Sequence, residues 1–307
     1  MKTLSIVVPV YFNEESLPIL AERLKAVEAA LLASDISLEL IFVDDGSGDQ
    51  SWGELLKVKA ARPETKLVKL TRNFGAVHAS KCGLQFVNGD CFLILAADLQ
   101  DPPELIPQLA ERWRQGSKFI ICARISRADP PVSKLFAAVY YWLLRRVVIS
   151  DYPKGGYDMA LMDRTMLLAL QTSSKSLYTP LLAYWLGFKP DVVHYHRAPR
   201  VYGRSQWTIR KRIKAFLDVM LGFSVTPIRV ISGFGAIISV CSFAYGISVA
   251  ANALAGRIPV PGFAALVTLI TFLLGLIIVM LGIIGEYLWR IFEETNKRPE
   301  VVIEDVL

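Results

Sequence analysis

Short apolar runs alternate along the first part of the chain with segments whose apolar positions recur at helical spacing. The apolar runs have the length of buried strands and cover residues 4–10, 38–43, 66–70, 91–95 and 119–122. Between them lie amphipathic segments at 17–32, 52–61, 76–86 and 103–114. This alternation predicts an α/β fold with a Rossmann-like, mostly parallel sheet that is covered by helices on both faces.

The last third of the chain has a different pattern, because charge disappears from two long stretches. No residue is charged from 230 to 256, and none from 258 to 285. Each stretch exceeds the roughly 20 apolar residues that a helix needs to cross a bilayer. We therefore predict two antiparallel transmembrane α-helices joined by a short loop, with two buried helices of a soluble protein as the alternative.

Basic residues predict the orientation of this pair. They are frequent before the first stretch and recur after the second, whereas the loop between them contains only Arg257. Cytoplasmic loops carry the excess of Lys and Arg, so both termini are predicted to be cytoplasmic.

An amphipathic basic segment precedes the first stretch. Within residues 207–226, Ile209, Ile213 and Phe216 recur at helical spacing, and Arg210 and Lys214 are among the residues that cover the remaining surface. This predicts an interfacial helix on the membrane, with a helix packed on the globular domain as the alternative. The predicted organisation is a globular domain over 1–206, this juxtamembrane helix over 207–226, a transmembrane hairpin over 227–290 and a cytosolic tail over 291–307.

Composition and charge support this division. Of the 307 residues 53% are hydrophobic, above the roughly 45–50% of a soluble domain. The first residues lack the pattern of a signal peptide, so we expect the globular part to lie in the cytosol. The formal net charge is +6, but the basic residues gather beside the apolar stretches. The charge therefore indicates membrane topology and not nucleic-acid binding.

Polar residues follow each of the first four predicted strands. Residues 9–15 read PVYFNEE, 44–47 DDGS, 72–75 RNFG and 97–104 ADLQDPPE. Ligands of parallel α/β sheets bind beyond the carboxyl ends of the strands, so we expect these segments to converge on one crevice. Any one of them alone is equally explained as a helix cap. The chain has no GxGxxG after its first strand and no GxxxxGK[ST], which disfavours a nicotinamide or P-loop site.

Taken together, these segments resemble the family-2, GT-A glycosyltransferases, specifically the polyprenyl-phosphate branch that includes dolichyl-phosphate mannose synthase and the bactoprenol glucosyltransferases. The resemblance covers nearly the whole chain. VDDGS at 43–47 marks only the broad superfamily, whereas ADLQDPPE, GGYD at 155–158 and the R-x-x-G-x-S at 200–205 are more specific. The resemblance implies a GT-A catalytic domain followed by the interfacial helix and two transmembrane helices.

The implied reaction is transfer of a hexose from a nucleotide sugar to undecaprenyl or another polyprenyl phosphate, at the cytoplasmic face of a bacterial inner (plasma) membrane. Glucose from UDP-glucose is the first expectation, and GDP-mannose or a UDP-amino sugar are the alternatives. A homo-oligomer is expected because two spans make a small membrane footprint, with a tetramer as a guess.

The resemblance also implies roles for matching positions. The nucleotide sugar would be held by Pro9, Tyr11, Glu14, Asp44, Asp45, Asn73, Gly75 and Asp98. Asp98, with Gln100 as a helper, would hold Mg²⁺ or Mn²⁺ on the diphosphate. The family normally has another acid two positions before Asp98, and this chain has Ala96 there. A metal is still predicted, because Mg²⁺ is normally bound through one or two carboxylates plus phosphates.

Asp98 and Asp158 are the predicted catalytic residues. Asp158 lies where the resemblance suggests a catalytic acid or base. A lipid phosphate is already largely ionised near neutral pH, since its second pKa is about 6 by analogy with phosphorylated side chains. Orienting the acceptor or binding sugar hydroxyls is therefore an equal alternative for Asp158.

The acceptor phosphate also needs cations close to the membrane. Guanidinium groups pair bidentately with phosphate. The predicted contacts to the acceptor phosphate, or alternatively to the diphosphate, are Arg124, Lys134 and Arg200, with Ser205 alongside. General attraction of these basic residues to anionic lipid is the alternative.

Two other functions compete with this prediction. A processive polysaccharide synthase of the same superfamily would need a membrane channel, for which two spans per chain are few. A membrane-tethered nucleotide-sugar sensor without turnover is favoured by Ala96, whereas Asp98, Gln100 and Asp158 favour an enzyme.

Overall fold

The computed structural model describes residues 1–124, 131–153, 155–175, 178–197, 216, 219–220, 222–224, 226–255, 262–296 and 298–307. The chain forms two compact units. The first comprises Met1–Asp218 together with Arg298–Leu307, and the second comprises Val219–Lys297.

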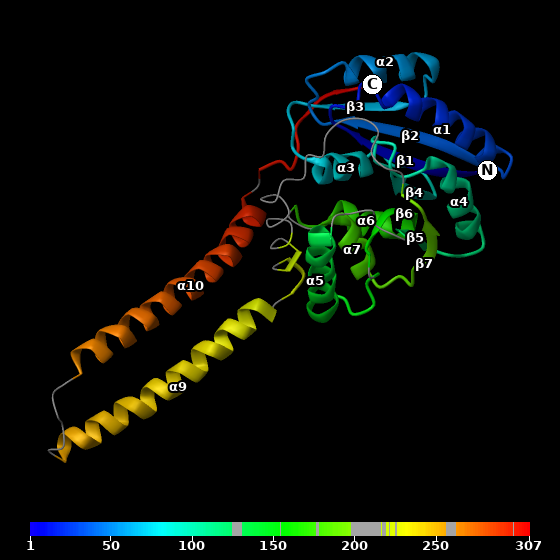
Figure 1. The fold of residues 1–307 in the computed structure, drawn as a ribbon. Helices are drawn as coiled ribbons and strands as arrows, with labels where there is room; N and C mark the ends of the chain where they lie inside the picture. Colours follow the sequence, from blue (N-terminus) through cyan, green and yellow to red (C-terminus); the bar gives the residue numbers. More distant parts are fainter. Residues whose placement is uncertain are drawn as a thin grey trace. The chain divides into compact units, whose positions relative to one another are not determined.

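The first unit is built on an eight-stranded sheet, whose spatial order is β7-β5-β6-β4-β1-β2-β3-β8 (Figure 1). The strands are β1 (Lys2–Val10), β2 (Ile36–Asp44), β3 (Lys66–Leu70), β4 (Cys91–Ile94), β5 (Phe119–Arg124), β6 (Tyr157–Asp163), β7 (Asp191–Tyr195) and β8 (Ile303–Val306). Strands β3, β2, β1 and β4 are mutually parallel, as are β5 and β7. Strands β6 and β8 run antiparallel to their neighbours. The predicted α/β fold with a mostly parallel sheet is confirmed.

Helices cover the two faces of this sheet. They are α1 (Leu17–Leu32), α2 (Ser51–Ala61), α3 (Ala76–Leu84), α4 (Ile106–Arg114), α5 (Pro131–Val147), α6 (Leu167–Gln171) and α7 (Thr179–Trp185), with the short 3-10 helices η1 (Pro103–Leu105) and η2 (Arg164–Met166). Apolar side chains of α1, α2 and α4 share one core with alternate residues of β1, including Leu4, Ile6 and Val8. On the other face, α3 lies so close to β1 that a Cβ at Gly83 would be 2.3 Å from Cγ1 of Val7.

Part of the segment predicted as a cytosolic tail forms a strand, β8, that extends the sheet. Residues 298–307 belong to the first unit, where β8 pairs with β3 and the N–H of Thr71 donates to the Val302 carbonyl at 3.0 Å. Figure 1 shows this C-terminal strand lying along β3 at the edge of the sheet. An edge strand exposes unpaired N–H and C=O groups. The β-branched run at 301–303 supplies a partner for them.

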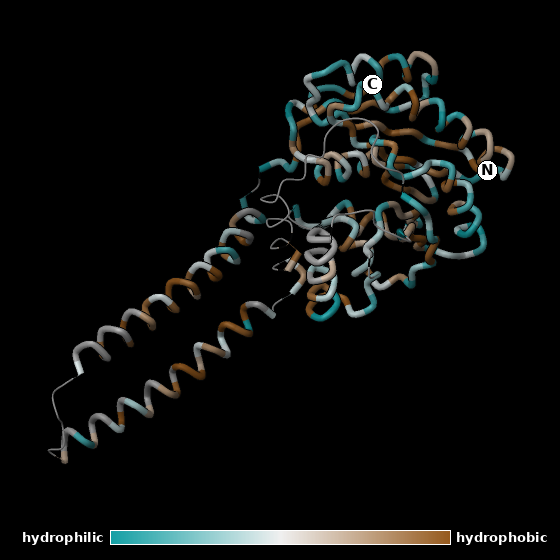
Figure 2. Tube along the Cα trace, in the orientation of Figure 1, coloured by the Kyte–Doolittle hydropathy of each residue, from teal (hydrophilic) through white to brown (hydrophobic). Residues whose placement is uncertain are grey.

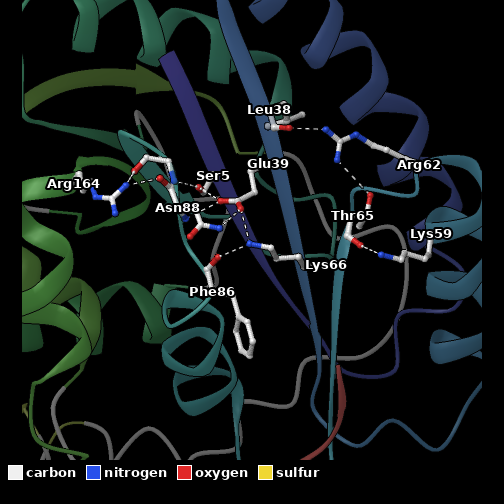
Figure 3. Close-up of polar contacts among 11 residues, drawn as sticks. Ser5, Leu38, Glu39, Lys59, Arg62, Thr65, Lys66, Phe86, Asn88 and Arg164 are labelled. Atoms are coloured by element: carbon white, nitrogen blue, oxygen red, sulfur yellow. Dashed lines mark hydrogen bonds and ion pairs between the residues drawn. The ribbon is translucent and has the colours of Figure 1, made fainter. Parts of the chain in front are cut away.

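A polar network joins the N-terminal halves of β1, β2 and β3, away from the strand ends that carry the predicted site (Figure 3). The Glu39 carboxylate accepts hydrogen bonds from Ser5 Oγ at 2.5 Å and from Lys66 Nζ at 2.7 Å. It also accepts the Asn88 N–H at 2.9 Å. Burial raises the pKa of Glu39, but these hydrogen bonds outweigh it and hold the pKa below its usual value. We interpret this network as structural, since it contains none of the predicted site residues.

The second unit contains the helices α9 (Thr226–Leu254) and α10 (Phe263–Thr295). Within α10 the 18-residue window Phe272–Trp289 has mean hydropathy 2.2 and is 0% buried, so it is long and apolar enough to cross a membrane. The apolar segment found in α9, Ile228–Ile238, is shorter. Figure 2 shows apolar residues along both helices. Among the described residues, one predicted span therefore meets the criterion of length and composition.

The predicted juxtamembrane helix at 207–226 falls mainly outside the described residues. The same holds for two predicted phosphate contacts, Arg200 and Ser205.

Candidate active site

The loop after β1 is held against the loop after β2 by side chain to backbone hydrogen bonds. The N–H of Phe12 donates to Ser47 Oγ in the loop after β2 at 3.2 Å, and the N–H of Asn13 donates to Ser51 Oγ at the start of α2 at 2.8 Å. Within its own loop, Asn13 Oδ1 accepts the N–H of Tyr11 at 3.0 Å. Phe12 has a φ of 54°, a left-handed conformation that is uncommon without glycine. The Phe12 side chain is 49% exposed although it is large and apolar. Such strain is typical of functional loops.

Two adjacent acids end β2 and have different roles. Both oxygens of Asp45 accept backbone N–H groups of the loop after β3, from Phe74 at 2.7 Å and from Gly75 at 2.9 Å. Asp44 accepts the N–H of Ser47 at 3.4 Å through Oδ1, while its buried Oδ2 has no hydrogen-bond partner. Burial raises the pKa of both carboxyls. Asp45 therefore holds the loop, and Asp44 has an oxygen that a ligand hydroxyl would satisfy.

Gly46 is required at the point where the loops after β2 and β3 cross. Its φ is +67°, and a Cβ there would lie 2.5 Å from the carbonyl carbon of Arg72. Gly116 has a similar backbone, with φ +105°, but open space around it.

We expect Gly46→Ala to lower the free energy of unfolding by more than the about 1–3 kcal/mol of backbone strain alone, because it also displaces the Arg72 backbone. Thermal unfolding of the purified protein measures the loss, with Gly116→Ala as the control that adds strain without the clash. Equal losses in the two variants would contradict a tight crossing at Gly46.

The loop after β4 carries the predicted metal ligands. Asp98 and Gln100 are half-buried, and Asp98 Oδ1 accepts the N–H of Gln100 at 3.2 Å. Leu99 between them has a φ of 61°, which is again left-handed. Asp101, which follows Gln100, is 4% exposed. Among the described residues there is no group of three or more His, Cys, Asp or Glu side chains that could hold a metal ion.

Asp158 and Arg124, which the sequence assigns to different functions, are paired with each other. Arg124 donates from Nε and Nη2 to the two carboxylate oxygens of Asp158, and both side chains are largely buried. Arg124 ends β5, and Asp158 is the second residue of β6. Because β6 runs antiparallel to β4 and β5, its beginning lies at the same edge of the sheet as their ends.

Three further side chains join this pair into a buried cluster. Tyr195 ends β7, opposite Arg124 in the β5–β7 register. Its hydroxyl lies 2.5 Å from Asp101 Oδ1 and 2.9 Å from Asp158 Oδ2. Arg197 Nε is 3.2 Å from Asp101 Oδ1, and Arg197 Nη1 is 3.8 Å from Asp158 Oδ1. The cluster thus holds two carboxyls, two guanidinium groups and one phenol.

The charges of this cluster interact strongly. Burial raises the pKa of Asp101, Arg197 opposes that shift and the Asp158 carboxylate adds to it. The pKa of Tyr195 is raised by burial and by the two neighbouring carboxyls. One phenol hydrogen serves two carboxyls here, so the position of Asp158 depends on Tyr195 as well as on Arg124.

Sequence reasoning did not assign roles to Asp101, Tyr195 or Arg197. Asp101 lies within the ADLQDPPE segment, whereas Tyr195 and Arg197 belong to none of the motifs singled out in the sequence. Of the predicted donor contacts, Pro9 and Tyr11 are half-buried, whereas Glu14 and Asn73 are exposed. Predicted contacts from Arg200 and Ser205 fall outside the described residues, and for Lys134 the structure describes the backbone, within α5.

An aromatic shell packs beneath the GGYD segment. Tyr157 stands at 6.0 Å from both Phe119 and Tyr152 between ring centroids, and its hydroxyl donates to the Pro180 carbonyl. A Cβ at Gly156 would lie 2.3 Å from the hydroxyl of Tyr141, which is on α5. This packing fixes the backbone just before Asp158.

The model of the family described as "Glycosyl transferase family 2" matches residues 5–157. An uncharacterized glycosyltransferase of Synechocystis sp. is 35% identical over 99% of this chain and 95% of its own length. The bactoprenol glucosyl transferase of Shigella phage SfV is 30% identical over 98% of each chain.

A crystal structure of glucosyl-3-phosphoglycerate synthase from Mycobacterium tuberculosis covers 71% of this chain and 80% of its own, with a TM-score of 0.50 and 17% identity. That likeness concerns the fold alone. With the family model over the strand ends and relatives aligned over nearly the full length, this chain belongs to glycosyltransferase family 2 and has its GT-A fold.

Proposed function

We propose that this chain transfers a hexose, glucose from UDP-glucose in the first place, to polyprenyl phosphate at the cytoplasmic face of a bacterial inner membrane. The observation that carries the proposal is the Arg124–Asp158 pair at the sheet edge to which the loops of Asp44 and Asp98 also belong. We call the loops after β1, β2 and β3 the donor half of the site and the surroundings of Arg124 the acceptor half. Both lie along one edge of the sheet. Full-length similarity to proteins named bactoprenol glucosyl transferase supports the acceptor class.

The donor half would use the loops after β1, β2 and β3. The unpartnered Oδ2 of Asp44 is buried, and such an oxygen is stabilised by a donor group from a ligand. A ribose hydroxyl or a base N–H of the nucleotide supplies that group. Tyr11 and Phe12 follow Val10, which is the partner of Asp44 in the β1–β2 register. Their rings pack edge to face with centroids 4.6 Å apart and would provide an aromatic surface for the base.

Asp98 and Gln100 would hold Mg²⁺ or Mn²⁺. Their oxygens suit a hard cation, and a site with one protein carboxylate fits an ion that takes its remaining ligands from phosphates and water. When bound, the ion acts as a Lewis acid that neutralises the departing diphosphate. Ala96, half-buried on the same loop, accounts for the small number of protein ligands.

The acceptor half would bring the lipid phosphate to Arg124. An oxygen of that phosphate attacks the anomeric carbon, and the bond from this carbon to the nucleotide diphosphate breaks. Because the phosphate is already ionised, Asp158 need not take a proton. Asp158 instead holds the Arg124 guanidinium in place. When the phosphate binds, Arg124 either stays paired with Asp158 or pairs with the phosphate, which is also a bidentate partner for arginine.

Membrane attachment would come from α9 and α10 as two spans with both termini cytoplasmic. The apolar window in α10 supports the second span, and the uncharged stretch of α9 supports the first. Attachment keeps the site near acceptors whose chains are dissolved in the bilayer. A homo-oligomer, for which a tetramer is a guess, would enlarge the small membrane footprint.

The experiment that tests this function measures transfer of radiolabelled sugar from a panel of UDP- and GDP-sugars to undecaprenyl phosphate, with and without Mg²⁺ or Mn²⁺. Metal-dependent label in the lipid from UDP-glucose is the expected result. Label from GDP-mannose or a UDP-amino sugar would replace the donor and keep the reaction. Nucleotide binding without label from any donor would favour the sensor, the function that Ala96 suggests.

A further inference from the structure

The C-terminal segment contacts α3 at a place that the proposed reaction does not use. Glu300 Oε1 is 2.9 Å from His78 Nδ1, and Glu300 Oε2 is 3.0 Å from Lys81 Nζ. His78 and Lys81 are three residues apart and therefore lie on one face of α3. Glu300 thus bridges the first and second turns of this helix.

The contact with Lys81 matters for stability because the Lys81 side chain is only 5% exposed, so its charge needs a partner. Its ammonium group also donates to the carbonyls of Ser173 at 2.5 Å and Ser174 at 3.3 Å. Glu300 provides the negative charge that a buried ammonium group needs. Burial raises the pKa of Glu300, but the bonds from His78 and Lys81 outweigh it and hold the pKa below its usual value.

Helix α3 is a direct continuation of the loop Arg72–Gly75, which the proposed donor half uses. The carbonyl of Gly75 accepts the N–H of Ala79 at 3.0 Å, and the N–H of Gly75 donates to Asp45. A shift of the first turn of α3 must therefore move Gly75 or break its bond to Asp45. Gly75 has a φ of +102°. Because glycine has no Cβ, this residue can take other backbone conformations when the loop is not held.

The same C-terminal segment also holds the other end of this loop. Thr71 immediately precedes Arg72, and its N–H donates to the Val302 carbonyl at 3.0 Å. Next to it, Leu70 pairs with Ile303 in the antiparallel register of β3 and β8. The loop Arg72–Gly75 is therefore bracketed by Val302 on one side and by Glu300, through α3, on the other.

We propose that Glu300, which precedes β8 in the C-terminal segment, is a positioning residue for nucleotide-sugar binding. Glu300 acts through His78 and Lys81 on α3 and so sets the geometry of the loop Arg72–Gly75. The inference rests on the proposed donor function. Part of the affinity for the nucleotide would then come from Glu300, which follows α10 in the sequence.

The test compares the full-length protein in detergent with its Glu300→Gln variant, by calorimetric titration with UDP and GDP. We expect the Kd of the nucleotide that the wild-type protein binds to rise about tenfold. Asp305→Asn is the matched control. It removes one carboxylate from the same segment, and the Asp305 carboxylate accepts the N–H of its neighbour Val306. Its Kd is expected to stay at the wild-type value.

Hydrogen–deuterium exchange gives a second readout that needs no ligand. In Glu300→Gln the peptide over residues 71–79 is expected to exchange faster, with little change in the strands, because the loop has lost one of the two restraints that the C-terminal segment provides. If the variant yields too little folded protein, Glu300→Leu combined with Lys81→Met removes both buried charges together and is measured in the same way.

An unchanged Kd in Glu300→Gln, even with a lower melting temperature, would overturn the inference and leave Glu300 a structural residue. An equal rise in Asp305→Asn would overturn it too, as a general effect of charge. If the wild-type protein binds neither nucleotide, the proposed donor class fails and this inference fails with it.

Discussion

Asp158→Asn is expected to lower kcat by about 100-fold, the scale of the loss when a group that positions the substrate is misplaced. Asparagine has the shape of aspartate without its charge, so Arg124 would lose its carboxylate partner and Arg197 would lose one of the two carboxylates that it faces. The Arg124 guanidinium would then turn toward Asp101 or solvent and would no longer meet the acceptor phosphate in one orientation. Initial rates at saturating donor and acceptor measure the change, and thermal unfolding checks that the variant is folded.

Tyr195→Phe is the companion to this variant. It keeps both carboxylates and removes the hydroxyl that lies between them, at 2.5 Å from Asp101 and 2.9 Å from Asp158. The loss of one hydrogen bond, about 1 kcal/mol, predicts a decrease in kcat of about five- to tenfold. A folded Asp158→Asn variant with wild-type turnover would remove Asp158 from both of its proposed roles.

Asp98→Asn is expected to decrease kcat/KM by about 100- to 1000-fold, because Lewis-acid stabilisation of the departing diphosphate contributes several kcal/mol. The effect should be larger here than in a site with several carboxylates. Because position 96 is alanine, Asp98 is the carboxylate to which metal binding is assigned on this loop. Turnover as a function of Mn²⁺ concentration measures it. The concentration for half-maximal rate should rise together with the loss of rate.

Ala96→Asp provides the opposite test on the same loop. Ala96 is half-buried, and a second carboxylate there is expected to lower the Mn²⁺ concentration needed for half-maximal rate. A wild-type metal dependence in folded Asp98→Asn would show that the metal, if used, is held elsewhere. A metal-independent wild-type enzyme would remove the metal from the mechanism altogether.

Much of the fold follows from local patterns. The apolar runs predicted β1 to β5 because a parallel strand covered on both faces is mostly apolar, as β1 is from Ile6 to Val8. Strand β8 was missed for a related reason. It lies at an edge and all four of its residues are exposed, so nothing in its own sequence requires burial.

The donor loops were also accessible to sequence reasoning, since the carboxyl ends of parallel strands must meet at one edge of the sheet. That argument brings Asp44, Gly75 and Asp98 to the same edge without any knowledge of contacts. It does not distinguish Asp44 from Asp45, whose oxygens are taken by the backbone of Phe74 and Gly75. Adjacent acids look alike in a sequence, and only the crossing loop decides which of them remains available.

The sequence by itself determined the α/β class, the apolar C-terminal stretches and the family, because these depend on periodicity, composition and contiguous motifs. The tertiary structure alone decided that Arg124 pairs with Asp158, that Tyr195 joins Asp158 to Asp101, and that Glu300 meets Lys81 across 219 positions of the chain. Each of these contacts joins side chains from separate elements. Such a partnership depends on strand order and register, which no local pattern of residues encodes.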